Sequence, residues 1–141
     1  MMSYDVWLKN NDVLEVNFTY NLQPMFEAAA LSTTIFHELA GQLVYSWNVE
    51  SLKTYGFKPY NGVDDDDFDG WNWSFNNLHG KGCRTTVEVL AQMLNRMVLN
   101  RKTYEAFNPE NGWGNYDQAV GVLILIILAC NKYPDDTLMV G

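Results

Sequence analysis

Two segments, residues 17–21 (Asn-Phe-Thr-Tyr-Asn) and 108–116 (Asn-Pro-Glu-Asn-Gly-Trp-Gly-Asn-Tyr), carry the side chains best suited to bind a small ligand. Asn and Thr both donate and accept hydrogen bonds, Trp and Tyr offer flat faces for stacking, and Gly lets a ligand approach the backbone. This combination predicts a pocket for a small polar molecule with a planar ring. The candidate ligand-binding residues are Asn17, Thr19, Asn21, Asn111, Trp113 and Tyr116.

The same two segments also allow a purely structural interpretation. Asn caps helices and closes turns, and each segment is followed by a predicted helix. Trp113 and Tyr116 can equally close one end of a hydrophobic core. Both interpretations stay open at this point.

An acidic cluster covers residues 64–69 and suggests calcium chemistry. Asp65, Asp67 and Asp69 occupy the first, third and fifth positions of a calcium-binding loop, with Gly70 at the turn. The twelfth position is Asn76, where such a loop needs a bidentate Glu. We therefore expect a solvated acidic turn, with a calcium site as the alternative, and we expect no other metal or cofactor.

Signatures of catalysis are weak. His37-Glu38 begins like the zinc-protease helix motif, but position 41 is Gly where a second His is needed. Residues 79–82 (His-Gly-Lys-Gly) offer backbone donors to a phosphate, yet lack P-loop spacing, so a plain turn is favoured. We expect binding rather than catalysis, and a hydrolase that uses carboxylates or His79 is the remaining enzymatic alternative.

Length and charge narrow the class of protein. The chain has 141 residues and a formal charge of −8, which predicts one domain over residues 1–141 and disfavours direct nucleic-acid binding. The longest apolar run, residues 120–130, is too short to span a membrane, so we expect it to be a core element and expect no membrane partner. The first five residues lack a signal peptide, which favours the cytoplasm. Cys83 and Cys130 are expected to be free thiols, with Cys130 buried.

The pattern of apolar residues predicts an α+β fold, in which an N-terminal antiparallel hairpin packs with three to four helices. A long ordered loop is expected at residues 55–82, where Gly, Asn, Asp and aromatic residues are dense. The predicted strands are residues 4–8 and 13–18, with a possible edge strand at 138–140. The predicted helices begin just after Asn21, at Ile35, after a cap at Thr85 or Thr86, and after a cap at Asp117.

Residues 17–22, followed by Met25-Phe26, and residues 108–117 resemble a family of small phage and prophage proteins without an assigned activity. Gly80-Lys81 also fits this resemblance, which covers the opening strands, the first helix and the chain from about Leu78 onward. Relative to shorter members, residues 32–77 look like a family-variable insertion. The resemblance implies the host cytoplasm and raises counter-defence as a class of function.

The leading hypothesis is a non-enzymatic phage-type protein that sequesters a small nucleotide-like ligand through the six candidate residues. The alternative is an acidic inhibitor or nucleic-acid mimic that binds a host protein. That alternative uses the cluster at residues 64–69 together with exposed Trp71 and Trp73. A homo-oligomer is also expected to be possible, because pockets are often completed between subunits.

Overall fold

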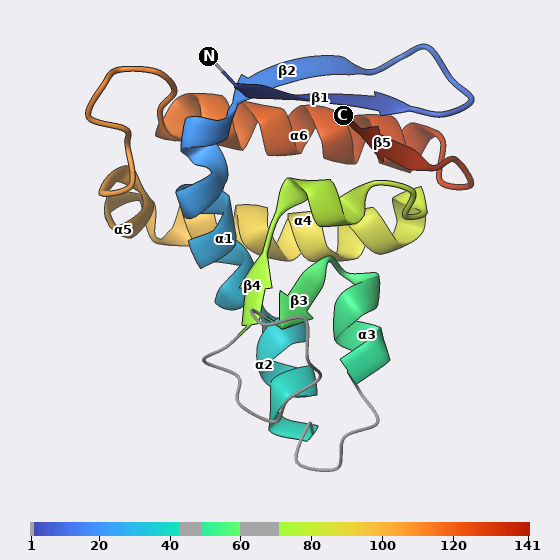
Figure 1. Ribbon diagram of the computed structural model, residues 1–141, viewed down its shortest axis with the longest axis horizontal. Helices are drawn as coiled ribbons and strands as arrows, with labels where there is room; N and C mark the ends of the chain where they lie inside the picture. The colour runs from blue at the N-terminus through green and yellow to red at the C-terminus, as the bar shows by residue number, and fades with distance from the viewer. Residues whose placement is uncertain (1, 43–48, 60–70) are drawn as a thin grey trace.

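The structure is a computed structural model that describes residues 2–42, 49–59 and 71–141, and it confirms the α+β class (Figure 1). The strands are β1 (Ser3–Leu8), β2 (Glu15–Thr19), β3 (Phe57–Pro59), β4 (Trp71–Trp73) and β5 (Leu138–Val140). The α-helices are α1 (Gln23–Leu31), α2 (Thr34–Gln42), α3 (Val49–Thr54), α4 (Cys83–Leu99), α5 (Arg101–Glu105) and α6 (Tyr116–Lys132). Among the described residues, the 3-10 helices are η1 (Tyr20–Leu22) and η4 (Phe75–Leu78).

The main sheet has the antiparallel order β2-β1-β5. Strand β1 is central, and Val6 lies opposite Val16 on one side and Val140 on the other. Alternation along β1 buries Tyr4, Val6 and Leu8 and turns Asp5 and Trp7 outward, as expected for a sheet with one face on the core. The predicted hairpin and the predicted C-terminal edge strand are both confirmed.

Helix α6 lies between this sheet and α4 (Figure 1). Both helices bury residues spaced three and four apart, which places one apolar face of each against the other. The buried residues of α4 are Cys83, Thr86, Val89, Leu90, Met93 and Met97, and those of α6 are Tyr116, Ala119, Val122, Leu123, Ile126, Ala129 and Cys130.

The second sheet, β3-β4, corrects the expectation of a long loop over residues 55–82. Lys58 pairs with Asn72, and α1 holds the far strand because the side-chain amide of Gln23 donates to the Trp73 carbonyl at 2.6 Å. The expectation of exposed Trp71 and Trp73 is also wrong, since both side chains are buried. The Trp73 ring packs edge-on against Phe75, so these tryptophans belong to the core.

Two helix starts differ from the prediction. Helix α4 begins at Cys83 with Gly82 as its N-cap, which is earlier than the predicted cap at Thr85 or Thr86. Helix α6 is capped by Asn115, whose side chain accepts a hydrogen bond from the Gln118 amide at 2.9 Å. Asp117 lies in the first turn instead, where its charge favours the helix dipole.

The thiols of Cys83 and Cys130 are free and buried, and burial raises the pKa of both. Within the described residues, no helix combines the length and apolar character needed to cross a membrane.

A single carboxylate ties the hairpin to the C-terminal part of the chain. Buried Asp136 accepts hydrogen bonds from the side-chain amides of Asn10 and Asn11, at 2.9 and 2.6 Å, and from the Thr137 amide at 2.7 Å. Its own carbonyl accepts from the Cys83 amide at the start of α4. Burial alone raises the pKa of Asp136, but these hydrogen bonds outweigh burial and hold that pKa below its ordinary value of 3.8.

We expect Asp136→Asn to lower the free energy of unfolding at neutral pH, because the network favours the charged carboxylate. The folded-state pKa lies below the unfolded value, so this contribution is complete above about pH 4 and is lost as the pH falls further. Urea unfolding at about pH 7 and about pH 3 measures the difference. Asp135→Asn, at the exposed neighbour, is the control and should change little. A deficit of equal size at both pH values would contradict the charge-based account.

Candidate functional site

The structure brings together the two predicted binding segments, residues 17–21 and 108–116, although they lie far apart in sequence. We call them the two corners. The Asn21 side-chain amide lies 3.5 Å from both the Asn111 Oδ1 atom and the Trp113 carbonyl oxygen. Asn111 Oδ1 also accepts a hydrogen bond from the Trp113 amide at 3.0 Å. The 3-10 helix η1, which follows β2, and the loop between α5 and α6 therefore form one site.

Glycine is required where the two corners touch. Gly114 has a φ of +94°, and a Cβ atom there would lie 2.8 Å from Thr19 Cγ2 and 2.9 Å from Leu22 Cδ2. The backbone of the loop therefore sits directly on the end of β2 and η1. Gly112 also has a positive φ, of +77°, but a Cβ atom there would meet no described atom within 4 Å.

Tyr116 anchors the far end of the loop. Its buried hydroxyl donates to the Met97 carbonyl at 2.9 Å, and its amide donates to Asn108 Oδ1 at 2.7 Å. The Arg101 guanidinium lies 4.8 Å from the centre of the Tyr116 ring, a cation–π contact. For Tyr116, the geometry matches the structural interpretation, in which the side chain closes the core.

A cavity of about 570 Å³ lies between β2, this loop and α6, and we call it the Trp113 cavity. Asn17, Thr19 and Trp113 of the six candidate residues line it, whereas Asn21, Asn111 and Tyr116 support the loop from outside the lining. Its full lining is Glu15, Val16, Asn17, Phe18, Thr19, Gly112, Trp113, Gly114, Gln118, Gly121, Val122 and Leu125.

The residues contributed by α6 were missed from the sequence. Gly121, Val122 and Leu125 belong to the apolar run that we assigned to the core as a whole. Gln118, one turn earlier, was not singled out either. The interruption of the apolar run by Gly121 was the one available signal.

The side chains around the Trp113 cavity set its chemistry. Trp113 is 57% exposed at the mouth. Thr19 Oγ1 accepts a hydrogen bond from the Asn21 amide, which leaves the hydroxyl proton free to be donated. Asn17 donates to Ser3 and Asp5 across the outer face of the sheet. Among the described residues that line this cavity, Glu15 alone carries a charge, so the cavity favours neutral or cationic groups over phosphate.

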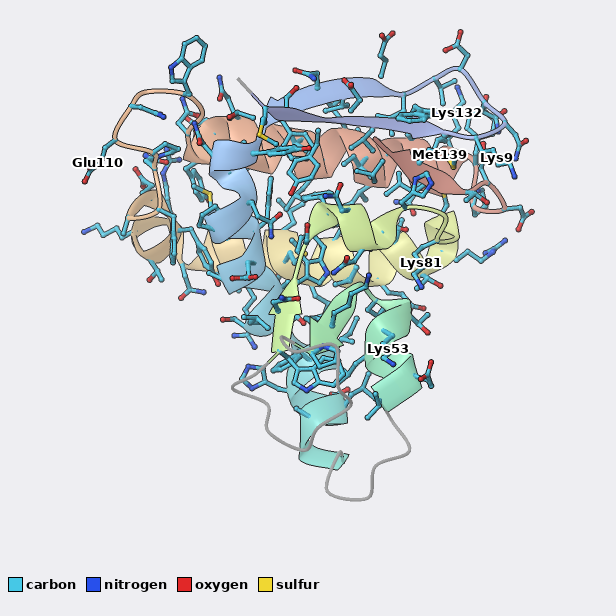
Figure 2. All side chains as sticks on the ribbon, in the orientation of Figure 1. Lys9, Lys53, Lys81, Glu110, Lys132 and Met139 are labelled. Carbon is cyan, nitrogen blue, oxygen red and sulfur yellow. The ribbon has the colours of Figure 1, made fainter. Side chains whose placement is uncertain are left out.

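Positive charge gathers in a second cavity, of about 610 Å³, which we call the lysine cavity. Figure 2 labels Lys53 on α3 and Lys81 between η4 and α4, and Lys58 on β3 also lines the cavity, so three of the chain's six lysines meet here. His79 Nδ1 accepts a hydrogen bond from the Val140 amide at 3.0 Å. The proton of the neutral ring therefore sits on Nε2. The full lining is Glu50, Lys53, Lys58, Pro59, Asn76, Asn77, His79 and Lys81.

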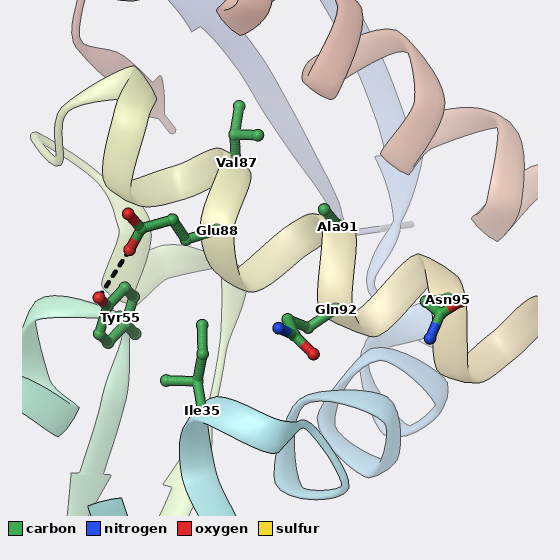
Figure 3. Close-up of a pocket in the computed structure, with 7 residues that line it drawn as sticks. All are labelled: Ile35, Tyr55, Val87, Glu88, Ala91, Gln92 and Asn95. Carbon is green, nitrogen blue, oxygen red and sulfur yellow. Dashed lines mark hydrogen bonds between the residues drawn. The ribbon is translucent and has the colours of Figure 1, made fainter. Parts of the chain in front are cut away.

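A third cavity, of about 500 Å³, lies between α2, α4 and Tyr55 (Figure 3). The Tyr55 hydroxyl donates to Glu88 Oε2 at 2.6 Å. This hydrogen bond, followed by burial, raises the pKa of Tyr55 to about 12. The phenol thus keeps its proton at neutral pH, and it is no candidate for a general base there. The other lining residues, including Ile35 and Gln92, are apolar or carry amides.

Other predicted features fall outside these cavities or outside the described residues. The acidic cluster at residues 64–69, with the candidate calcium ligands Asp65, Asp67 and Asp69, lies outside the described residues. Within the described ranges, no group of three or more His, Cys, Asp or Glu side chains is placed to hold a metal ion. His37 is exposed on α2.

No protein-family model, no curated protein and no solved structure matches this chain. The resemblance to small phage proteins therefore stays a prediction, and we infer the function from the geometry of the site.

We expect Gly114→Ala to lower the free energy of unfolding by about 2–5 kcal/mol. The substitution adds a left-handed backbone cost of about 1–2 kcal/mol to an overpacking cost of about 1–3 kcal/mol. Gly112→Ala is the matched control, because it carries the backbone cost in open space. Urea unfolding of both variants compares the two costs. Equal destabilisation would show that the loop does not pack on Thr19 and Leu22 as described.

Proposed function

We propose that the protein is a non-enzymatic binding protein that holds the planar ring of a small nucleoside-like ligand against Trp113. The observation that carries this proposal is an exposed indole on an anchored loop. Asn111 and Gly114 fix the backbone on either side of Trp113 while the side chain stays largely in solvent. An ordered tryptophan that contributes little to the core is an effective surface for stacking.

The walls of the Trp113 cavity support recognition of a base. Stacking on an aromatic side chain contributes about 1–3 kcal/mol per base. The Thr19 hydroxyl and the Gln118 amide supply donors and acceptors for ring edges, and Val122 and Leu125 supply apolar contact. Asn17 can add only its Oδ1 acceptor, because its amide hydrogens bind Ser3 and Asp5. Since Glu15 opposes an anion, the ring and sugar are the parts of a nucleotide that this cavity favours. Sequestration of such a molecule would suit counter-defence, the class of function that the phage resemblance raises.

The test is titration calorimetry with adenosine, guanosine, cytidine and uridine and with their 5′-monophosphates. We expect at least one nucleoside to bind, with no gain from the phosphate. Trp113→Ala should weaken that binding at least tenfold, about 1.4 kcal/mol, while the free energy of unfolding changes by less than about 0.5 kcal/mol. Trp7→Ala, at an exposed tryptophan on the outer face of the sheet, is the control. Unchanged affinity in Trp113→Ala would overturn the assignment, as would the absence of binding by every nucleoside.

The lysine cavity favours a second candidate function, the binding of a phosphate-bearing ligand. Lys58, Lys81 and His79 line it in a chain with a charge of −8, and the one carboxylate among the described lining residues, that of Glu50, is paired with Lys53 at 3.3 Å. Phosphate recognition by lysine ammonium groups and a ring N–H is well suited to such a cavity. The protein-inhibitor alternative loses its two aromatic anchors, because Trp71 and Trp73 are buried.

Pyrophosphate is the probe for this second candidate. We expect Lys58→Ala and Lys81→Ala each to weaken its binding about three- to tenfold, with a loss of affinity at higher salt. Lys102→Ala, on α5, is the control for a general change of charge. Equal weakening by all three variants would point to non-specific attraction and would contradict a defined site.

A further inference from the structure

Helix α6 presents an apolar stripe to solvent on the side away from the core. Ile124, Leu125 and Leu128 are 41%, 52% and 61% exposed, and Gly121 continues the stripe by one turn. Polar residues close both ends: Asp117 and Gln118 at the start of the helix, and Asn131 and Lys132 at its end. An apolar centre with a polar rim is the composition of an interaction surface.

The stripe is complementary to itself when it is read in the opposite direction. Around a centre between Ile124 and Leu125, small Gly121 mirrors large Leu128. The amide of Gln118 mirrors the amide of Asn131, and the outermost pair joins the negative charge of Asp117 to the positive charge of Lys132. A surface of this kind satisfies the condition for a two-fold interface, in which each residue meets the mirror residue of an identical copy.

Gly121 adds an independent observation. Glycine inside a helix is less favourable than alanine by about 1 kcal/mol. No packing contact within the described chain requires glycine here, because a Cβ atom at this position would meet no described atom within 4 Å. Because glycine has no side chain, it permits another molecule to approach the helix backbone closely. Leu128 of a second copy would make that approach.

We propose that α6 packs antiparallel against α6 of a second copy, about a two-fold axis between Ile124 and Leu125. From Asp117 to Lys132 the contact runs about 22 Å along the helix, at 1.5 Å per residue. The opposite charges at its ends fix the antiparallel direction. Asp117 already pairs with Arg101 at 3.2 Å, and its exposed carboxylate has room for the partner's Lys132 as well.

This dimer does not depend on the proposed ligand, although the two surfaces touch. Gly121 and Leu125 line the Trp113 cavity, so a second copy would close one side of that cavity. Leu128 lies outside the lining. A substitution at Leu128 therefore tests the dimer, whereas Trp113→Ala tests the ligand.

Sedimentation equilibrium at about 1 to 100 µM protein tests for the dimer. The buffer contains about 0.15 M salt, which screens the repulsion between the like net charges of the two copies. We expect the wild-type chain to dimerise and Leu128→Glu to weaken dimerisation at least tenfold, because it buries a carboxylate against Gly121. Leu99→Glu is the matched control, at a leucine that is 72% exposed at the end of α4, and it should leave the dimer intact. A monomeric wild-type chain, or a dimer unaffected by Leu128→Glu, would overturn the proposal.

A volume exchange tests the register. Gly121→Leu should dissociate the dimer without unfolding the monomer, since the position faces open space. In the double variant Gly121→Leu with Leu128→Ala, the new leucine at position 121 meets the new alanine at position 128 of the other copy. The total volume of the pair is then nearly restored, and we expect dimerisation to recover. Dissociation that the second substitution does not relieve would contradict the pairing of Gly121 with Leu128.

Discussion

The packing of α6 between the sheet and α4 is the constraint on which the rest of this structure depends. The start of α6 fixes the loop that carries Trp113, because Tyr116 at its first turn is anchored to α4 through the Met97 carbonyl. Its end leads into Asp136, which joins the hairpin to β5 and to the start of α4. The same helix therefore sets the position of the ligand cavity at one end and of the sheet at the other.

The regular part of the fold follows from the sequence, and the irregular part depends on distant pairing. Alternation in β1 and β2 and helical spacing in α4 predicted those elements, since each pattern is local. Strands β3 and β4 have three residues each, and their pairing at Lys58 and Asn72 is supported by α1, whose Gln23 donates to the Trp73 carbonyl. Helix α6 was recognised as a core element, but its sequence is apolar nearly all round and so does not indicate which side stays exposed.

The sequence predicted which two segments form the candidate site. It did not predict which of their residues line the cavity and which support the loop. Trp113 and Tyr116 are similar aromatic residues three positions apart, yet one is exposed over a cavity and the other is buried on Met97. Residue type cannot separate these outcomes, because they depend on how the loop meets α4. The lysine cavity was beyond local patterns as well, since Lys58 and Lys81 are scattered in sequence and meet only through folding.

Two residues near β2 and α6 contribute little to the stability of a single chain. Trp113 is ordered at a cost in conformational entropy but buries little apolar surface, and Gly121 weakens a helix whose geometry accepts alanine. Alanine at position 121 would stabilise the helix of a single chain, whereas Trp113→Ala is expected to change the stability of that chain little. The presence of Trp113 and Gly121 on one side of the molecule indicates that this side serves binding and not the stability of the fold. The two-fold complementarity of α6 points to a second copy as one binding partner.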